Sequence, residues 1–532
     1  MEAKFSYLKR FLLSGILGGG LATIVLFVGT ELFGFPFPPL VIFQLLISPV
    51  PGSIQSVMVE TFREYAKYSA FFFSSVIYVA LYGAIAVLLG VLFRGRIHGR
   101  ERHVTLVGTL IPTLIGMGLQ IQLASAFPVI SSAWGWLFTS LLLVAANLIY
   151  STVVMRYVST AVLKPVGEIP SLQVSSRRVF LKRATIVAIV IGVGGIAARI
   201  GLSLFSNQPV VTSSNSVPVN PELKPVTVEA PKIFLDPRIG DLVGSEVTDS
   251  RVFYRVDINP ISPQLDLDKW TLNVAGKVDT QKVFDRNSFA KLPTVDQYAT
   301  LECVSNTINP PGGLISNTKW TGVPISTLLN QAGPASNAKY VVFRCADGYT
   351  VGVPIERAMI GLLASRMNDE ILPQEHGFLL RAIVPGIYGM MNAKWITEIE
   401  VTDQVYLGYW QERGWSNDAR IKTTSIIYHP GPNARINGET PIAGVAFAGD
   451  RGISKVEVSV DGGNTWTEAT LKPPRSAASW VLWAYLWTPK STGTARIVTR
   501  AYDGNGNVQD SSITEPFPNG ASGYAAVEVS VV

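Results

Sequence analysis

The hydrophobic residues of this chain are concentrated before residue 206, and this asymmetry constrains the fold more than any other feature. A helix needs about 20 apolar residues to cross a bilayer. Five runs approach or exceed that length, at 11–33, 69–93, 104–126, 133–155 and 184–205. The rest of the 532-residue sequence is largely polar. We therefore expect an α-helical membrane domain of five spans, followed by folded domains outside the lipid.

The stretch 35–51 contains five prolines and is too broken to form a sixth span. Irregular backbone is tolerated at membrane depth only where protein or a water-filled cavity surrounds it. We expect a re-entrant or interfacial loop there.

Lysine and arginine residues gather in alternate connections, which indicates the orientation of the spans. They precede the first run and fill the second and fourth connections, whereas the other two connections are nearly neutral. This predicts a multi-pass protein of the cell membrane with a cytoplasmic N-terminus and an extracytoplasmic C-terminal half. The lipid bilayer is thus one partner. The net charge of +6 does not indicate nucleic acid, because the basic residues lie beside membrane segments.

A twin-arginine motif at 176–182 lies immediately before the fifth run. Arg177 and Arg178 are followed by Phe180, Leu181 and Lys182. Such motifs are typical of signals read by a bacterial or archaeal translocase, and a chain usually needs that route when a folded domain takes up a bulky cofactor before export. The alternative is an ordinary basic stop on the cytosolic side of a transmembrane helix.

The membrane region, residues 1–206, shows little sign of chemistry of its own. No histidine lies within a run, although a membrane haem needs such ligands, and Glu31 is the main ionisable residue inside one. We expect an anchor, with an unrecognised transport or quinone role as the alternative. Residues 207–231, rich in Ser, Asn, Val and Pro, predict a disordered tether.

Only two cysteines occur, Cys303 and Cys345, so the exported half is not a disulfide scaffold. Their separation excludes a local CxxC motif. A thiolate is a soft ligand that suits a transition metal, but a single cysteine at a strand end is more often a small buried hydrophobic residue. We interpret Cys345 in that second way.

Two folded domains are predicted after the tether. Between 232 and 424 short strand-like runs, among them 271–274, 340–344 and 396–401, alternate with helical segments and Gly/Pro turns, which indicates an α+β domain. Between 425 and 532 the alternating run 453–460 meets an Asp-Gly-Gly hairpin turn and Trp466. Several such strands predict a β-sandwich of about 100 residues.

Residues 250–532 contain an ordered series of short motifs. They are Phe253–Asp257, Trp270–Gly276, Cys303, Trp320–Pro324, Leu372–Phe378 running to Arg381, Val384–Gly389, and Lys394 with Trp395. In order and spacing this series resembles the sulfite oxidase family of molybdenum-cofactor enzymes. Phe253–Asp257 keeps the Phe and the Arg of the family's Phe-x-Arg-Asn-His segment, and Cys303 stands where the family places its molybdenum ligand.

The resemblance implies a molybdopterin-binding catalytic domain at 232–424 and an immunoglobulin-like dimerisation domain at 425–532. The implied cofactor is molybdenum-molybdopterin, with Cys303 as the metal ligand and Arg255 as the residue that faces the metal and binds an anion. The residues that it implies for cofactor binding are Tyr254, Arg255, Cys303, Asn306, Asp347, His376, Arg381, Asn392 and Lys394. Asp347 could instead belong to a hairpin turn, and His376 could be an ordinary loop histidine.

The sequence departs from the sulfite-oxidising pattern at two places. Thr307 and Ile308 follow Asn306 where those enzymes have two arginines, and Asp257 replaces the family's histidine. Both changes make the pocket less attractive to a dianion such as sulfite.

We predict a membrane-anchored oxidoreductase that transfers an oxygen atom to or from a small oxyanion, S-oxide or N-oxide. The chain has no CxxCH haem motif, so a separate electron carrier such as a cytochrome is expected, together with a homodimer formed through the C-terminal domain. The alternative is a multispan protein that displays a degenerate cofactor domain and an adhesive β-sandwich.

Overall fold

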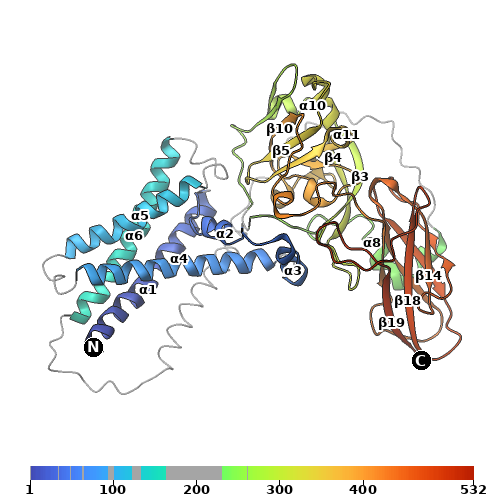
Figure 1. The fold of residues 1–532 in the computed structure, drawn as a ribbon, viewed down its shortest axis with the longest axis horizontal. Helices are drawn as coiled ribbons and strands as arrows, with labels where there is room; N and C mark the ends of the chain where they lie inside the picture. Colours follow the sequence, from blue (N-terminus) through green and yellow to red (C-terminus); the bar gives the residue numbers. More distant parts are fainter. Residues whose placement is uncertain are drawn as a thin grey trace. The chain divides into compact units, whose positions relative to one another are not determined.

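The computed structural model describes residues 2–33, 35–47, 49–62, 65–93, 101–122, 133–162, 231–259 and 262–532. The chain divides into two compact units (Figure 1). The first comprises Met1–Phe37, Ser75–Leu119 and Trp136–Thr227, and the second Pro38–Ser74, Gln120–Gly135 and Val228–Val532. The predicted export signal at 176–182, the run at 184–205 and, apart from Pro231, the tether at 207–231 lie outside the described residues.

Four described helices are long and apolar enough to cross a membrane. They are α1 (Glu2–Phe33), α4 (Tyr65–Leu92), α5 (Glu101–Gln122) and α6 (Ala133–Val162). They coincide with the first four predicted runs, which confirms the apolar helices but not the exact number of spans. The proline-rich stretch forms two short helices, α2 (Pro39–Ile47) and α3 (Gly52–Phe62), bent by 114°. This bend fits a broken span or a re-entrant loop.

Small and polar residues pack the helices of the first unit against one another. A Cβ atom on Gly19 would lie 2.5 Å from the Cβ of Tyr82, so this glycine permits the close approach of α1 and α4. Tyr82 donates to Asn147 Oδ1 at 2.7 Å, and Asn147 donates to Thr113 Oγ1 at 3.0 Å. The expectation of an anchor rested on the scarcity of ionisable residues in the apolar runs, and this uncharged network was not predicted.

Two sheets in the second unit hold most of the site, one mixed because β1 and β10 are parallel, and one fully antiparallel. The first has the order β2-β1-β10-β5-β6, and the second has the order β3-β4-β7-β8 with β9 paired to β7. The strands of the first sheet are β1 (Thr271–Gly276), β2 (Lys282–Asp285), β5 (Tyr340–Cys345), β6 (Thr350–Pro354) and β10 (Ile396–Thr402). Those of the second are β3 (Val295–Glu302), β4 (Ile315–Pro324), β7 (Leu362–Met367), β8 (Glu370–Ile371) and β9 (Arg381–Ile383).

Short helices connect and cover these strands. The α-helices are α8 (Gly240–Gly244), α9 (Arg286–Phe289), α10 (Ile325–Ala332) and α11 (Ile355–Met359). The 3₁₀ turns are η2 (Lys232–Leu235), η3 (Pro237–Ile239), η4 (Gln374–His376), η5 (Gly389–Met391), η6 (Gln411–Arg413) and η7 (Gly449–Arg451). Leu328 and Leu329 of α10 pack in one core with Val341 and Phe343 of β5. The predicted α+β character and the three predicted strands of this region are confirmed.

The C-terminal residues form two further sheets, with the orders β11-β13-β17-β16 and β12-β19-β18-β14-β15. Their strands are β11 (Thr424–His429), β12 (Arg435–Ile436), β13 (Thr440–Phe447), β14 (Ile453–Ser459), β15 (Thr467–Glu468), β16 (Thr470–Leu471), β17 (Val481–Trp487), β18 (Gly493–Asp503) and β19 (Ala525–Val531). Buried residues of both sheets, such as Trp483 and Ile497, share one core. The immunoglobulin-like character of this pair stays a prediction.

Candidate active site

A short loop fixes Cys303 at the end of β3. The Cys303 amide donates to the Leu314 carbonyl at 2.9 Å, and the Asn306 side chain accepts from the Leu314 amide at 3.0 Å. Asn306 also donates to the Glu302 carboxyl at 2.9 Å. The thiol itself is buried, 3.0 Å from the Ser305 hydroxyl. Asn306 thus acts on the loop that presents the thiol.

A cavity opens beside Cys303 and encloses roughly 840 Å³ of empty space, its open mouth included. Every predicted site residue lines it except Asn306 and His376. The predicted residues brought together are Tyr254, Arg255, Cys303, Asp347, Arg381, Asn392 and Lys394. Arg381 begins β9 and the other residues lie in loops, among them Cys303 after β3, Asp347 after β5 and Lys394 before β10, so strands of both sheets position the site.

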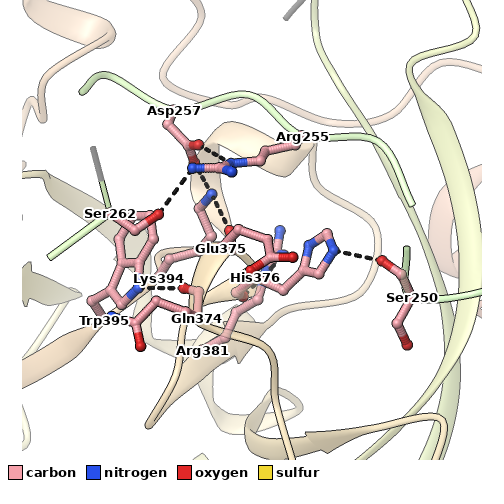
Figure 2. A network of polar contacts seen from close by, with 10 residues as sticks. All are labelled: Ser250, Arg255, Asp257, Ser262, Gln374, Glu375, His376, Arg381, Lys394 and Trp395. Atoms are coloured by element: carbon pink, nitrogen blue, oxygen red, sulfur yellow. Dashed lines mark hydrogen bonds and ion pairs between the residues drawn. The ribbon is translucent and has the colours of Figure 1, made fainter. Parts of the chain in front are cut away.

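Asp257 lies between two cations at the wall of this cavity. Its carboxylate forms ion pairs with the Arg255 guanidinium and with the Lys394 ammonium group (Figure 2). Arg255 also donates to the Ser262 hydroxyl at 2.9 Å, and Lys394 donates to the Glu375 carbonyl at 3.2 Å. Only 1% of the Asp257 side chain is exposed. The carboxylate that replaces the family's histidine therefore offsets positive charge at this wall.

His376 points away from these charged residues. Its Nε2 atom lies 2.7 Å from the Ser250 carbonyl oxygen, as Figure 2 shows. Burial, with a contribution from the nearby Arg381 charge, lowers the pKa of His376 to about 4. The ring is therefore neutral at pH 7 and ties the segment before Phe253 to η4.

Arg381 is a buried cation of the cavity wall. It donates to the His376 carbonyl at 3.3 Å, and its guanidinium lies 5.4 Å from the centroid of the Trp320 ring. Burial lowers the pKa of Arg381 to about 10, so the group remains charged at neutral pH.

Asp347 lies both in a hairpin turn and at the cavity, the two positions that the sequence left open. It lies in the turn between the antiparallel strands β5 and β6, followed by Gly348 with φ of +83°. It also lines the cavity, and its carboxylate accepts from the Tyr349 amide at 3.0 Å. Burial raises the pKa of Asp347 to about 7.

Several residues of this region were missed in the sequence. Burial raises the pKa of Glu302 to about 7, and its Oε2 atom has no hydrogen-bond partner among the described residues. Trp410, Trp415 and Gln55 line the cavity from segments outside the motifs that we compared. Of these residues, only Glu302 had a sequence feature that could have indicated a place near the site, namely its position directly before Cys303.

Thr307 and Ile308, which follow Asn306 in place of two arginines, lie in a different environment from Asp257. Ile308 is buried in the core shared by the two C-terminal sheets, and neither Thr307 nor Ile308 lines the cavity. Among the departures from the family pattern, Asp257 alone changes the charge of the described cavity wall.

The buried polar atoms of the cavity fit a polar cofactor. Arg381 Nε, Trp415 Nε1 and Gln55 Oε1 are buried without a hydrogen-bond partner in the described part of the chain, and all three residues line the cavity. Unsatisfied buried polar groups are uncommon in folded proteins. A ligand with both donors and acceptors, such as a molybdopterin, would satisfy them, while Cys303 supplies the soft donor that its metal requires.

Comparison with known proteins identifies the two folded regions. Residues 259–410 match the oxidoreductase molybdopterin binding domain, and residues 416–516 match the Mo-co oxidoreductase dimerisation domain. The chain carries the domains of a molybdopterin-dependent oxidoreductase.

Two curated relatives and one solved structure show partial similarity to the chain. The chain is 28% identical to the mitochondrial sulfite oxidase of Rattus norvegicus over 321 residues, which cover 51% of this chain and 59% of the relative. It is 27% identical to the NADH nitrate reductase of Ulva prolifera over 316 residues, 47% of this chain and 36% of the relative. The crystal structure of the sulfane dehydrogenase SoxCD from Paracoccus pantotrophus aligns with 24% identity and a TM-score of 0.47, over 53% of this chain and 80% of that one.

The chain spans 58–59% of the length of the rodent and human sulfite oxidases that it matches. Its α1 to α6 region lies outside both matched domains.

The buried carboxyl of Asp347 should make folding stability depend on pH. Its pKa of about 7 in the fold lies above the value of about 4 expected in the unfolded chain. The stabilisation is therefore complete below pH 4 and is lost as the pH rises to 7, by up to about 1.4 kcal/mol per pH unit. Asp347→Asn should remove this component, as measured by denaturant unfolding of cofactor-free chain in detergent.

Asp369→Asn, which changes an exposed carboxylate, is the control and should keep the wild-type pH slope. Equal slopes for Asp347→Asn and the wild type would show that Asp347 is ionised throughout this range.

Proposed function

We propose that this chain is a membrane-anchored molybdenum-cofactor oxidoreductase that catalyses oxygen-atom transfer on a small oxo substrate outside the cytoplasmic membrane. The observation that carries the proposal is a single cavity that contains the Cys303 thiol, the cations Arg255, Arg381 and Lys394, and the Asp347 carboxyl. A thiolate suits the metal, and fixed cations suit the phosphate of a pterin and an oxygen-rich substrate.

The residues divide the work between holding the cofactor and holding the substrate. Arg381 and Lys394 would bind the pterin and its phosphate, and Asp347 would accept hydrogen bonds from pterin amino groups. Cys303 would ligate the metal. When bound, the cofactor supplies the two-electron redox chemistry, and the protein supplies position and electrostatics. Arg255 would orient the substrate, because its guanidinium lines the same cavity as the thiol.

Electrons would pass to or from a separate carrier such as a cytochrome, since the sequence contains no CxxCH motif. A homodimer would form through the C-terminal sheets, in keeping with the match of residues 416–516 to a dimerisation domain.

The proposed outer location is supported by the number of spans. Helices α2 and α3 belong to the same compact unit as the catalytic strands, so both should face the same side of the membrane. The three described spans α4, α5 and α6 separate them along the chain. A return to the same side needs one more crossing, for which the apolar sequence at 184–205 is suited. With a cytoplasmic N-terminus, that common side is the extracytoplasmic one.

The two cysteines provide a matched test of the metal site. Cys303→Ser should abolish turnover and sharply reduce bound molybdenum, because the soft thiolate ligand is lost. Cys345→Ser should leave both nearly unchanged, since Cys345 is buried outside the cavity lining and burial raises the pKa of its thiol well above the usual value. Molybdenum content and dye-linked activity are measured on the purified chain.

Full activity in Cys303→Ser would contradict the assignment of this cysteine as the metal ligand. A wild-type chain without molybdenum, after expression in a host that makes the cofactor, would instead favour a degenerate, adhesive protein.

The export signal is tested by a conservative double substitution. Arg177→Lys with Arg178→Lys should retain the folded half in the cytoplasm, because a twin-arginine translocase reads the arginine pair rather than its charge. A cytosol-only fluorescent reporter after Val532 should be dark in the wild type and bright in the variant. Arg94→Lys with Arg96→Lys, in another basic connection, is the control and should stay dark.

Normal export of the Arg177/Arg178 variant would indicate the general secretion route and would remove the argument for cofactor loading before export.

Substrate charge should be governed by the pair Arg255 and Asp257. Asp257 offsets one of the positive charges at the wall, so sulfite should bind poorly and a neutral or singly charged oxo substrate should turn over better. Arg255→Gln should weaken an anionic substrate about ten- to a hundredfold through loss of a charge-assisted hydrogen bond. It should leave a neutral S-oxide nearly unaffected, whereas Asp257→Asn should strengthen sulfite binding.

Steady-state kinetics with sulfite and with a neutral S-oxide check both variants. A micromolar KM for sulfite in the wild-type enzyme would contradict the proposed charge balance.

A further inference from the structure

The bent helix pair α2–α3 (Pro39–Ile47 and Gly52–Phe62) contacts the residues around the cavity. It lies within the same compact unit as the catalytic strands, although it precedes them by more than two hundred residues. Neither matched domain includes it. Three independent contacts join the pair to the residues around the cavity.

The first contact is a close approach at the start of α3. A Cβ atom on Gly52 would lie 2.5 Å from the Arg413 carbonyl oxygen, 2.7 Å from the Phe517 ring and 3.0 Å from Trp415 Nε1. Trp415 is itself a lining residue of the cavity. Only glycine fits here without a displacement of the neighbouring backbone.

The second contact is a hydrogen-bonded chain that begins on α2. Gln44 donates to the Asn259 side chain at 3.3 Å, and Asn259 donates to the Asp347 carbonyl at 2.8 Å. Helix α2 is therefore linked through one side chain to the turn that carries a proposed pterin-binding carboxyl.

The third contact is Gln55, whose side chain lines the cavity together with Val59. Gln55 is 5% exposed, and its Nε2 atom donates to the carbonyls of Ile47 and Val50 at 3.1 and 2.9 Å, which fixes the amide across the bend. Its Oε1 atom is buried and has no partner among the described residues. A buried acceptor held in this way requires a donor from the occupant of the cavity.

We propose that α2–α3 forms one wall of the cofactor cavity and that Gln55 Oε1 accepts a hydrogen bond from an N–H or amino group of the bound pterin. The pterin is chosen over the substrate because an oxo substrate offers acceptors, whereas a pterin offers the donors that Gln55 Oε1 needs. This inference rests on the proposed function for the identity of the occupant. The wall itself rests on the contacts of Gly52, Gln44 and Gln55 alone. The connection between the first two spans is then part of the binding site rather than only a link in an anchor.

The existence of the wall is tested without reference to the cofactor. Single cysteines are placed at two adjacent positions of α3, Gln55→Cys at the buried position and Ile54→Cys at a position that is 53% exposed. The reaction of each full-length variant with a water-soluble maleimide is measured in detergent. Gln55→Cys should react at least tenfold more slowly than Ile54→Cys. Equal rates would overturn the proposal whether or not the preparation contains molybdenum.

The role of the wall in holding the cofactor is tested by the rate of pterin loss from the full-length enzyme. Gln55→Leu removes the acceptor, and Gly52→Leu forces α3 away from Trp415. Both variants should release pterin and molybdenum about tenfold faster or more. Gln55→Leu removes the acceptor of one buried hydrogen bond, and Gly52→Leu moves that acceptor away from its donor. Ser53→Leu, at the exposed neighbouring position, should match the wild type.

Wild-type retention in both Gln55→Leu and Gly52→Leu would overturn the proposed role of Gln55. If the purified chain contains no molybdenum but the Gln55→Cys thiol still reacts slowly, the proposed function is contradicted. The proposal that α2–α3 forms a wall of the cavity would then still stand.

Discussion

The rest of the site depends on the two ion pairs of Asp257. Its carboxylate is almost fully buried between the Arg255 and Lys394 cations. A charge removed from water is tolerated when it is paired, and loss of one partner leaves an uncompensated buried charge. The three side chains come from one loop before β1 and one loop before β10, so this cluster also holds two distant segments together. It sets both the geometry and the local charge at the wall.

The cavity results from the convergence of strand ends belonging to two sheets. Cys303 follows β3 and Arg381 begins β9 in one sheet, whereas Asp347 follows β5 and Lys394 precedes β10 in the other. Functional side chains positioned in this way keep their separation, because each strand is fixed by its ladder of backbone hydrogen bonds. Arg381, Trp415 and Gln55 each have a buried polar atom without a partner among the described residues, and all three line this cavity.

Local pattern predicted much of the secondary structure. The apolar runs predicted α1, α4, α5 and α6, and period-two alternation predicted β14, because burial on one face of an element produces a periodic pattern in its sequence. The order of motifs pointed to Cys303, Arg381 and Lys394, which line one cavity, and their roles there stay predictions. The ion pair between Asp257 and Lys394 could not be read in this way, because it depends on how two loops far apart in the sequence meet.

Other features were hidden for related physical reasons. Ile308 occupies a position of the cysteine motif but packs in the core of the C-terminal sheets. His376 is hydrogen-bonded to the Ser250 carbonyl and does not line the cavity. Gln55 carries no local signal, since an amide in an apolar stretch is compatible with many roles, and its importance follows only from a tertiary contact. Residues that complete a site from outside its motifs are the ones that a linear reading misses.

The central claim is that Cys303 and a pterin together bind molybdenum in this cavity. Molybdenum X-ray absorption of the purified full-length chain measures the sulfur atoms bound to the metal. We expect about one molybdenum per chain with three sulfur ligands, two from the pterin and one from Cys303. A metal site with only two sulfur ligands, unchanged when Cys303 is replaced by serine, would contradict it.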